Sequence, residues 1–221
     1  MKYRHELLND KWVIEYIYKG MRGGFFVEAG ATNGINGSGT FILEKEFGWT
    51  GICVEAIDEQ YEKLLQFRNC RSDNRCLSGE SGKIVEFCYF PERSGHSGIP
   101  ATFNPKNSHM VEIENLIIRQ KKTVSLSDLL DEHDAPQIID YLCLDIEGHE
   151  LDVIEKLPFL NNRIILACSI EGQKCNDIMK NEYASVSNPY TGQKFDKYFI
   201  HKDIRKYRDV NLKNIINSSD V

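Results

Sequence analysis

The sequence predicts an α/β fold, in which helices cover both faces of a mostly parallel, seven-stranded sheet that closes with an antiparallel hairpin. Short apolar runs end in an acidic residue at 25–28, 49–55 and 138–145. Segments with helical spacing separate these runs, as the crossover connections between parallel strands require. Two further strand-like runs, 183–186 and 197–201, flank a turn near the C-terminus. We therefore expect a three-layer sandwich.

The composition is that of an ordinary globular domain. The chain has 221 residues, of which 41% are hydrophobic, so we expect one domain over 1–221 with a continuous core. The formal net charge of −6 argues against a nucleic-acid partner, because phosphates require a basic surface. The first twenty residues hold no long apolar stretch. We therefore expect neither a signal peptide nor a membrane span, and a cytoplasmic location.

Seven cysteines are spread along the chain without a Cys-x-x-Cys pair. Several lie in apolar, strand-like runs, where a thiol acts as a small hydrophobe. We therefore expect reduced thiols, with neither a disulfide framework nor a zinc site. The histidines show no His-Glu-x-x-His pattern, which also argues against zinc.

The N-terminal part predicts a helix, a strand and a glycine-containing turn. Near-helical spacing over 6–19 indicates an amphipathic helix within 1–22, packed on the sheet or covering a cofactor. The run 25–27 is a short buried strand, and Glu28 stands at its carboxyl end. In an open α/β sheet that end faces the ligand. An acid followed by Gly-x-x-x-Gly (30–34) favours a polar, partly cationic ligand.

The same turn disfavours a dinucleotide. A dinucleotide site places a pyrophosphate on Gly-x-Gly-x-x-Gly at a helix N-terminus. Here Thr32 replaces the second glycine, and Glu28 would repel phosphate. S-adenosylmethionine carries an ammonium and a sulfonium and no phosphate, so it is the cofactor that we expect. A dinucleotide oxidoreductase remains the less favoured alternative.

The second strand also ends in an acid. A helix is expected over 40–47, followed by a strand over 49–56 that carries Glu55. Glu55 lies 27 positions after Glu28, near the separation of about 20 residues at which such an acid meets ribose hydroxyls. Asp58 is expected to cap the next helix. The apolar stripe of that helix, expected in the core, consists of Tyr61, Leu64 and Leu65.

The third strand is the hardest to assign. Residues 75–78 are a short candidate, and 83–90 form a longer one with alternating aromatic residues. Ser78 is expected beside the adenine. Residues 91–112 contain several glycines and prolines and are expected to form a lid or acceptor loop. The chain then returns as a strand over 113–124.

Another strong signal follows the buried strand predicted over 138–144. Asp145 and Glu147 are expected in the ligand crevice, because they stand at the carboxyl end of that strand. Asp152 is expected only to decorate the N-terminus of the next helix, where anions are favourable. The ionisable residues directly behind this strand are Asp145, Glu147, His149 and Glu150.

Four motifs resemble, in the same order, those of FkbM-type methyltransferases. They are Phe-Val-Glu-Ala-Gly-Ala-Thr-Asn-Gly (26–34), Gly-Trp-Thr-Gly-Ile-Cys-Val-Glu (48–55), Ser-Leu-Ser-Asp-Leu-Leu (125–130) and Ile-Asp-Tyr-Leu-Cys-Leu-Asp-Ile-Glu-Gly-His-Glu (139–150). The resemblance implies a class I methyltransferase (Rossmann-like) fold and S-adenosylmethionine as donor. It also implies, as the usual acceptor, a hydroxyl of a sugar, glycolipid or natural product, and in some relatives an amide nitrogen.

The donor site can be assigned residue by residue as a hypothesis. Glu28 and the glycine turn would border the methionine part of the donor, and Glu55 would accept hydrogen bonds from both ribose hydroxyls. The expected donor-binding residues are Glu28, Gly30, Ala31, Asn33, Gly34, Thr40, Glu55, Ala56, Ser78, Asp145 and Glu147.

Methyl transfer to a hydroxyl also requires a group that removes the proton. His149 is the first candidate, because an imidazole accepts a proton at neutral pH; the alternative is that it only caps the following helix. Glu171, at the end of a strand over 163–171, is the second candidate, and Asp145 or Glu147 would orient the base or the donor ammonium. We expect no metal, although a divalent ion held by Asp145, Glu147 and Glu171 is left open.

Two other functions stay open: N-methylation of an amide, and a methyltransferase-like module that binds without catalysis. Ser187-Asn188-Pro189-Tyr190 is similar to a box of amino-directed nucleic-acid methyltransferases, but that box follows the fourth strand, where Asp145-Ile146-Glu147-Gly148 stands here. A hairpin turn is therefore favoured. The expected partner is a small-molecule or glycan acceptor, which the sequence does not name.

Overall fold

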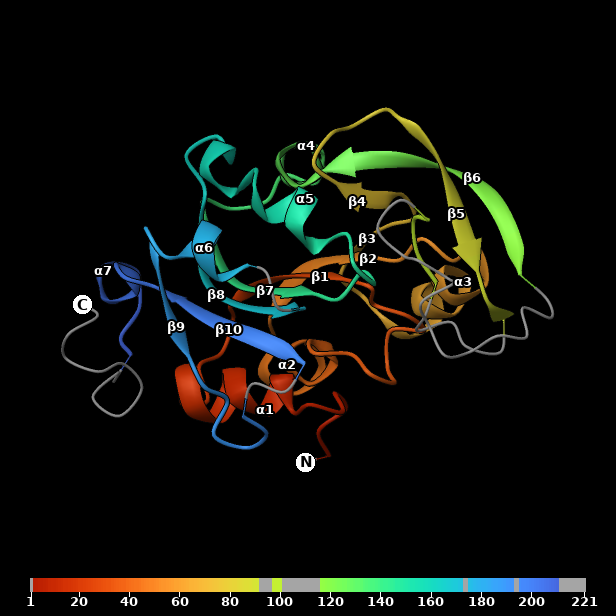
Figure 1. Cartoon of the computed structure of the whole chain (residues 1–221). Helices are drawn as coiled ribbons and strands as arrows, with labels where there is room; N and C mark the ends of the chain where they lie inside the picture. Colours follow the sequence, from red (N-terminus) through yellow and green to blue (C-terminus); the bar gives the residue numbers. More distant parts are fainter. Residues whose placement is uncertain (1, 92–96, 101–115, 173–174, 193–194, 211–221) are drawn as a thin grey trace.

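The computed structural model describes residues 2–91, 97–100, 116–172, 175–192 and 195–210. A seven-stranded sheet of order β3-β2-β1-β7-β8-β10-β9 runs through its centre (Figure 1). The strands are β1 Phe25–Ala29, β2 Thr50–Val54, β3 Arg71–Asp73, β7 Ile138–Leu144, β8 Ile164–Glu171, β9 Tyr183–Val186 and β10 Asp196–His201. All neighbours pair in parallel except β10, which is antiparallel to β8 and β9. The predicted α/β fold and its C-terminal hairpin are confirmed.

Side chains from the two faces of the sheet enter two different cores. Phe25 and Val27 pack in a cluster with Leu129, whereas Phe26, between them, packs in a cluster with Trp12. This alternation is the period of two of a strand buried on both faces, and it gives the three layers seen in Figure 1. The helices are α1 Asn9–Lys11, the π-helix Trp12–Ile17, α2 Phe41–Phe47, α3 Asp58–Phe67, α4 Leu126–Glu132, α5 Glu150–Ile154, the 3₁₀-helix Leu157–Phe159, α6 Asn176–Met179 and α7 Ile204–Tyr207.

The N-terminal helical segment packs on the sheet, as predicted. The Trp12 ring lies 4.9 Å from the Tyr198 ring and 6.3 Å from the Tyr141 ring, measured between centroids. Asn9 Nδ2 donates a 2.6 Å hydrogen bond to Asp196 Oδ2. The segment is therefore fixed to the last strands both by aromatic packing and by a buried polar contact.

The third strand of the main sheet is not where we expected it. It is the polar segment β3, whereas Cys76–Ser78 forms β4 of a second, three-stranded sheet with β5 Ile84–Tyr89 and β6 Ile117–Ser125, in the order β4-β6-β5. The expectation was wrong because β3 is an edge strand that pairs with β2 alone. Such a strand does not need the apolar run that we searched for.

The expected lid falls largely outside the described residues, which omit 92–96 and 101–115. Of its described part, Gly98 pairs with Cys88 of β5. An added Cβ on Gly98 would lie 3.4 Å from the carbonyl oxygen of Glu147. This short piece therefore lies against the loop after β7.

Two details of α3 correct the sequence analysis. Leu65 is 53% exposed, although Leu64 is fully buried, so the apolar face of α3 is narrower than we predicted. Asp58 is the first helical residue and not its cap; Ile57 precedes the helix without a side-chain hydrogen bond. Asp58 instead accepts a 2.7 Å hydrogen bond from Lys121 Nζ, which ties α3 to the second sheet.

The structure holds all seven cysteines as free thiols. In the described part of the chain, every helix is too short or too polar to cross a lipid bilayer.

Candidate functional site

The site is built where β1, β2 and β7 end. Gly30 has a φ of +81°, and a Cβ added to it would lie 1.8 Å from the carbonyl oxygen of Asp145. Its N–H donates to the carbonyl oxygen of Val54 at 3.0 Å. Only glycine allows this conformation and this approach together. Gly30 therefore draws the carboxyl ends of all three strands to one place.

Glu28 has a buried, fully occupied carboxylate. It accepts hydrogen bonds from Ser38 Oγ at 2.8 Å, Gly39 N at 2.6 Å and Thr40 Oγ1 at 2.6 Å. Arg68, whose side chain is fully buried, approaches it to 3.3 Å. These contacts fold the segment after the glycine turn back onto β1. Glu28 and Thr40 thus hold the loop together, and neither lines the cavity described below.

Three other residues that we expected to bind the methyl donor also shape the turn. Ala31 is fully buried. Asn33 Oδ1 accepts hydrogen bonds from the backbone of Ile35 at 3.0 Å and of Asn36 at 2.9 Å, which is the local turn typical of asparagine. Gly34 has a φ of +78°. None of Ala31, Asn33 and Gly34 lines the cavity.

A small cavity of about 100 Å³ opens beside Gly30. Glu55 and Ala56 line it from the end of β2. An apolar wall stands on one side, formed by a buried cluster that packs the second sheet onto the start of α3. The members of that wall are Ile57, Cys76, Phe87 and Ile99.

Glu55 is held by two backbone donors. Its carboxylate accepts hydrogen bonds from Thr32 N and from Ile57 N, both at 2.7 Å. Burial raises the pKa of Glu55 to about 7, although these hydrogen bonds oppose the shift. Each carboxylate oxygen still has acceptor capacity, so Glu55 can receive a further donor from a ligand in the cavity.

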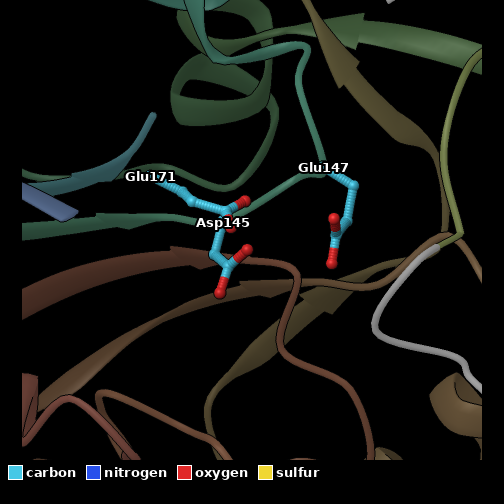
Figure 2. A group of neighbouring side chains, drawn as sticks. All are labelled: Asp145, Glu147 and Glu171. Atoms are coloured by element: carbon cyan, nitrogen blue, oxygen red, sulfur yellow. The ribbon is translucent and has the colours of Figure 1, made fainter. Parts of the chain in front are cut away.

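Three carboxyl groups gather where β7 and β8 end: Asp145, Glu147 and Glu171 (Figure 2). An oxygen of each lies within 4.8 Å of the others. Asp145 and Glu147 line the cavity, and Glu171 stands next to Asp145. Glu147 is in the loop after β7 with a φ of +59°.

The cluster binds protons tightly. Burial, and next the nearby charge of Glu171 and a hydrogen bond with it, raise the pKa of Asp145 well above its ordinary range. Burial and Asp145 raise the pKa of Glu147 to about 8. Burial raises that of Glu171 to about 7, with Glu147 acting in the same direction. Since like charges repel at this distance, the cluster favours a cation or a shared proton. A divalent ion would fit the spacing, but clusters of this kind occur without one, and we assign no metal.

His149 occupies the N-cap position of α5, but its side chain makes no capping hydrogen bond. Its Nε2 lies 3.0 Å from Asp152 Oδ2 and 3.2 Å from Ser78 Oγ. Its Nδ1 is buried and has no hydrogen-bond partner among the described residues. His149 lines the cavity. Ser78 contacts His149 but does not line the cavity. Asp152 contacts both residues, so it does more than place a negative charge at the start of a helix.

The structure thus brings together part of the predicted site. Gly30, Glu55, Ala56, Asp145, Glu147 and His149 line one cavity. Sequence analysis missed the apolar wall, because its residues come from the start of α3 and from a second sheet that we had not assigned. Alternating aromatics in 83–90 were its one visible signal. The missed lining residues are Thr32, Val54, Ile57, Arg75, Cys76, Leu77, Phe87, Ser97, Ile99 and Ile146.

The comparisons with known proteins identify the family. The sequence model described as the methyltransferase FkbM domain matches residues 28–207, which include all of the cavity residues named above. A search among curated proteins gives no match. Because the domain match covers most of the chain, the protein belongs to the FkbM methyltransferase family and is a methyltransferase.

Proposed function

We propose that the protein transfers a methyl group from S-adenosylmethionine to a hydroxyl of a sugar, glycolipid or natural product. The observation that carries this proposal is the combination of three chemistries in one cavity. Its lining includes the apolar residues Phe87 and Ile99, the carboxyl group of Glu55, and the acidic residues Asp145 and Glu147. Adenine, ribose and the cationic methionine part of the donor require an apolar surface, a hydrogen-bond acceptor and acidic groups.

The adenine and ribose ends fit the residues present. Phe87 and Ile99 offer an apolar surface for a flat base, and aromatic contacts of this kind are favourable beyond their buried area. Glu55 directly follows β2, which pairs with β1 up to Ala29, and its carboxylate keeps free acceptor positions for two hydroxyls. Charge-assisted hydrogen bonds are among the stronger ones in proteins. These two contacts would hold the nucleoside.

The methionine end fits by charge. S-adenosylmethionine supplies, when bound, an electrophilic methyl group on a sulfonium. Asp145 and Glu147 face the cavity with raised pKa values, and a bound cation would favour their ionised forms. Their carboxylates would therefore attract the ammonium and orient the donor.

The acceptor side follows from the same electrostatics. A cluster of acidic groups disfavours an anionic acceptor and is compatible with a neutral hydroxyl as the group to be methylated. Such a hydroxyl must lose its proton. His149 offers the unpartnered Nδ1 for this step, and the Asp145–Glu171 pair is the second candidate.

Calorimetric titration with S-adenosylhomocysteine, the demethylated donor, tests the proposal. We expect the wild type to bind, and Glu55→Gln to bind roughly ten- to a hundredfold more weakly, since a lost charged hydrogen bond costs about 1.5–3 kcal/mol. Glu62→Gln, an exposed change on α3, is the matched control. If the wild type binds NADH and not this ligand, S-adenosylmethionine is not its cofactor and the proposal fails. Binding of the donor without transfer to any hydroxyl or amide would indicate a binding module.

A further inference from the structure

Asp152 Oδ2 collects three hydrogen-bond donors at one point. Ser78 Oγ donates to it at 2.8 Å, Gly79 N at 2.5 Å, and His149 Nε2 lies 3.0 Å away. Although burial raises the pKa of Asp152, these contacts, the Gly79 N–H foremost, bring it below its ordinary value. Asp152 is therefore ionised at neutral pH and accepts only.

This arrangement fixes the tautomer of His149. The single hydroxyl proton of Ser78 is directed to Asp152, so it cannot also serve Nε2. Nε2 must then carry the ring proton and donate it to the carboxylate, which leaves the lone pair of a neutral imidazole on Nδ1. In histidine sites of known chemistry, the partner of one ring nitrogen determines what the other can do.

The contact is built into the fold. Ser78 ends β4 of the second sheet, while Asp152 and His149 belong to α5 and its start, more than 70 positions later in the chain. A Cβ on Gly79 would lie 2.7 Å from the carbonyl oxygen of Asp152 and 2.9 Å from its Oδ1. Glycine at this position thus allows α5 to approach β4.

Nδ1 is the ring nitrogen of His149 that these contacts leave without a partner. It is buried, it has no partner among the described residues, and it belongs to a side chain that lines the cavity. A buried polar atom without a partner costs free energy, and in native structures such an atom calls for an explanation. A donor group on a bound ligand would provide the missing partner.

We propose that Asp152 and Ser78 are positioning residues, which hold His149 as its Nε2–H tautomer so that Nδ1 receives the proton of the acceptor hydroxyl. This inference rests on the proposed function only for the identity of the proton donor. The tautomer is a property of the chain alone and can be measured without any ligand.

The test is a long-range ¹H–¹⁵N correlation spectrum of the histidines in the full-length protein at pH 8, with the His149 signals assigned from a His149→Gln variant. We expect the pattern of an Nε2–H tautomer in the wild type. Asp152→Ala should give a mixture of tautomers and lower kcat roughly ten- to a hundredfold, with the KM for the donor nearly unchanged. Ser78→Ala keeps the carboxylate and should lower kcat only a few-fold. Glu155→Ala, exposed at the end of α5, is the matched control.

An Nδ1–H tautomer in the wild type would overturn the proposal, and this result does not depend on any variant that fails to fold. An unchanged tautomer and unchanged kcat in Asp152→Ala would also overturn it. If the wild type shows the Nε2–H tautomer but binds no S-adenosylhomocysteine, the proposed function has failed while the positioning of His149 stands.

Discussion

The α-carbon of Gly30 faces the carbonyl oxygen of Asp145 so closely that a Cβ would lie 1.8 Å from it. Backbone, not a flexible side chain, blocks that space, so neither partner can give way. The end of β1 and the end of β7 can therefore approach each other this closely only because residue 30 has no Cβ. The geometry of the cavity depends on this contact, because both residues line it.

Gly30→Ala should consequently destabilise the fold and abolish donor binding. The change combines a disfavoured conformation with a backbone clash, and a strained backbone alone costs about 1–3 kcal/mol. Gly37→Ala is the matched control, because Gly37 has a similar φ of +74° but nothing within 4 Å of an added Cβ. Urea unfolding of both variants would check this. Equal losses in the two would show that the contact with Asp145 is unimportant.

Arg68→Met should cost more stability than most substitutions. The guanidinium donates to Glu44 at 2.7 Å and lies 3.3 Å from Glu28, with its side chain fully buried. Removing one partner of a buried ion pair costs about 3–5 kcal/mol, because the other charge is left uncompensated. Arg71→Met, at an exposed position three residues later, should change the free energy of unfolding by less than about 0.5 kcal/mol. A stable Arg68→Met variant would show that Glu28 is satisfied by the loop donors alone.

The apolar wall should contribute to donor affinity. Phe87→Ala should weaken binding of S-adenosylhomocysteine by roughly ten- to a hundredfold, in line with about 1–3 kcal/mol for a lost stacking contact with a base. Ile84→Ala changes the same strand at a residue that is 65% exposed and should leave binding unchanged. Calorimetric titration of both variants makes the comparison. Unchanged binding in Phe87→Ala would show that the adenine does not bind against this wall.

Stability should fall as the pH rises through the neutral range. The pKa values of Glu55 and Glu171 are raised to about 7, and that of Glu147 to about 8, from an ordinary value of 4.5. The folded state then binds protons more tightly than the unfolded state, so this stabilisation is present below pH 4.5 and is lost as the pH rises toward 8. Carboxyls with a lowered pKa, such as Glu44, stabilise the fold fully above pH 4.5. Their contribution changes only as the pH falls below that value, so it does not affect this range.

We therefore expect Glu55 alone to lower the Tm of the ligand-free protein by about 5–10 °C between pH 5 and pH 8.5, because its pKa of about 7 lies about two units above pH 5, at about 1.4 kcal/mol per unit and about 2–4 °C per kcal/mol. Scanning fluorimetry across this range measures it. Glu55→Gln should reduce the slope, and Glu62→Gln should not. A Tm that rises over the same interval would contradict the raised pKa values.

The sequence was sufficient for the parts of the site that local rules determine. Gly30, Glu55 and Asp145 follow apolar strands directly, and in a parallel sheet the carboxyl ends of strands meet at one edge. Their convergence could therefore be predicted without knowing how any side chain packs. The mostly parallel sheet with its closing hairpin was also predicted, but the polar edge strand β3 was missed.

Other parts depend on contacts between distant segments. Glu28 stands at a strand end like Glu55, yet Thr40 and Arg68 occupy it, since the chain folds back after the glycine turn. Spacing alone does not distinguish a satisfied carboxylate from an available one. Asp152 shows the converse: helix-end rules explain its residue type, but its function depends on Ser78, 74 positions earlier in the chain.

The central claim is that the donor binds in this cavity, and a crystal structure with S-adenosylhomocysteine tests it most directly. We predict that both ribose hydroxyls lie within hydrogen-bond distance of Glu55, that the adenine contacts Phe87 and Ile99, and that the ammonium is next to Asp145 or Glu147. Density for the ligand elsewhere on the protein, or an empty cavity at saturating ligand concentration, would contradict the account.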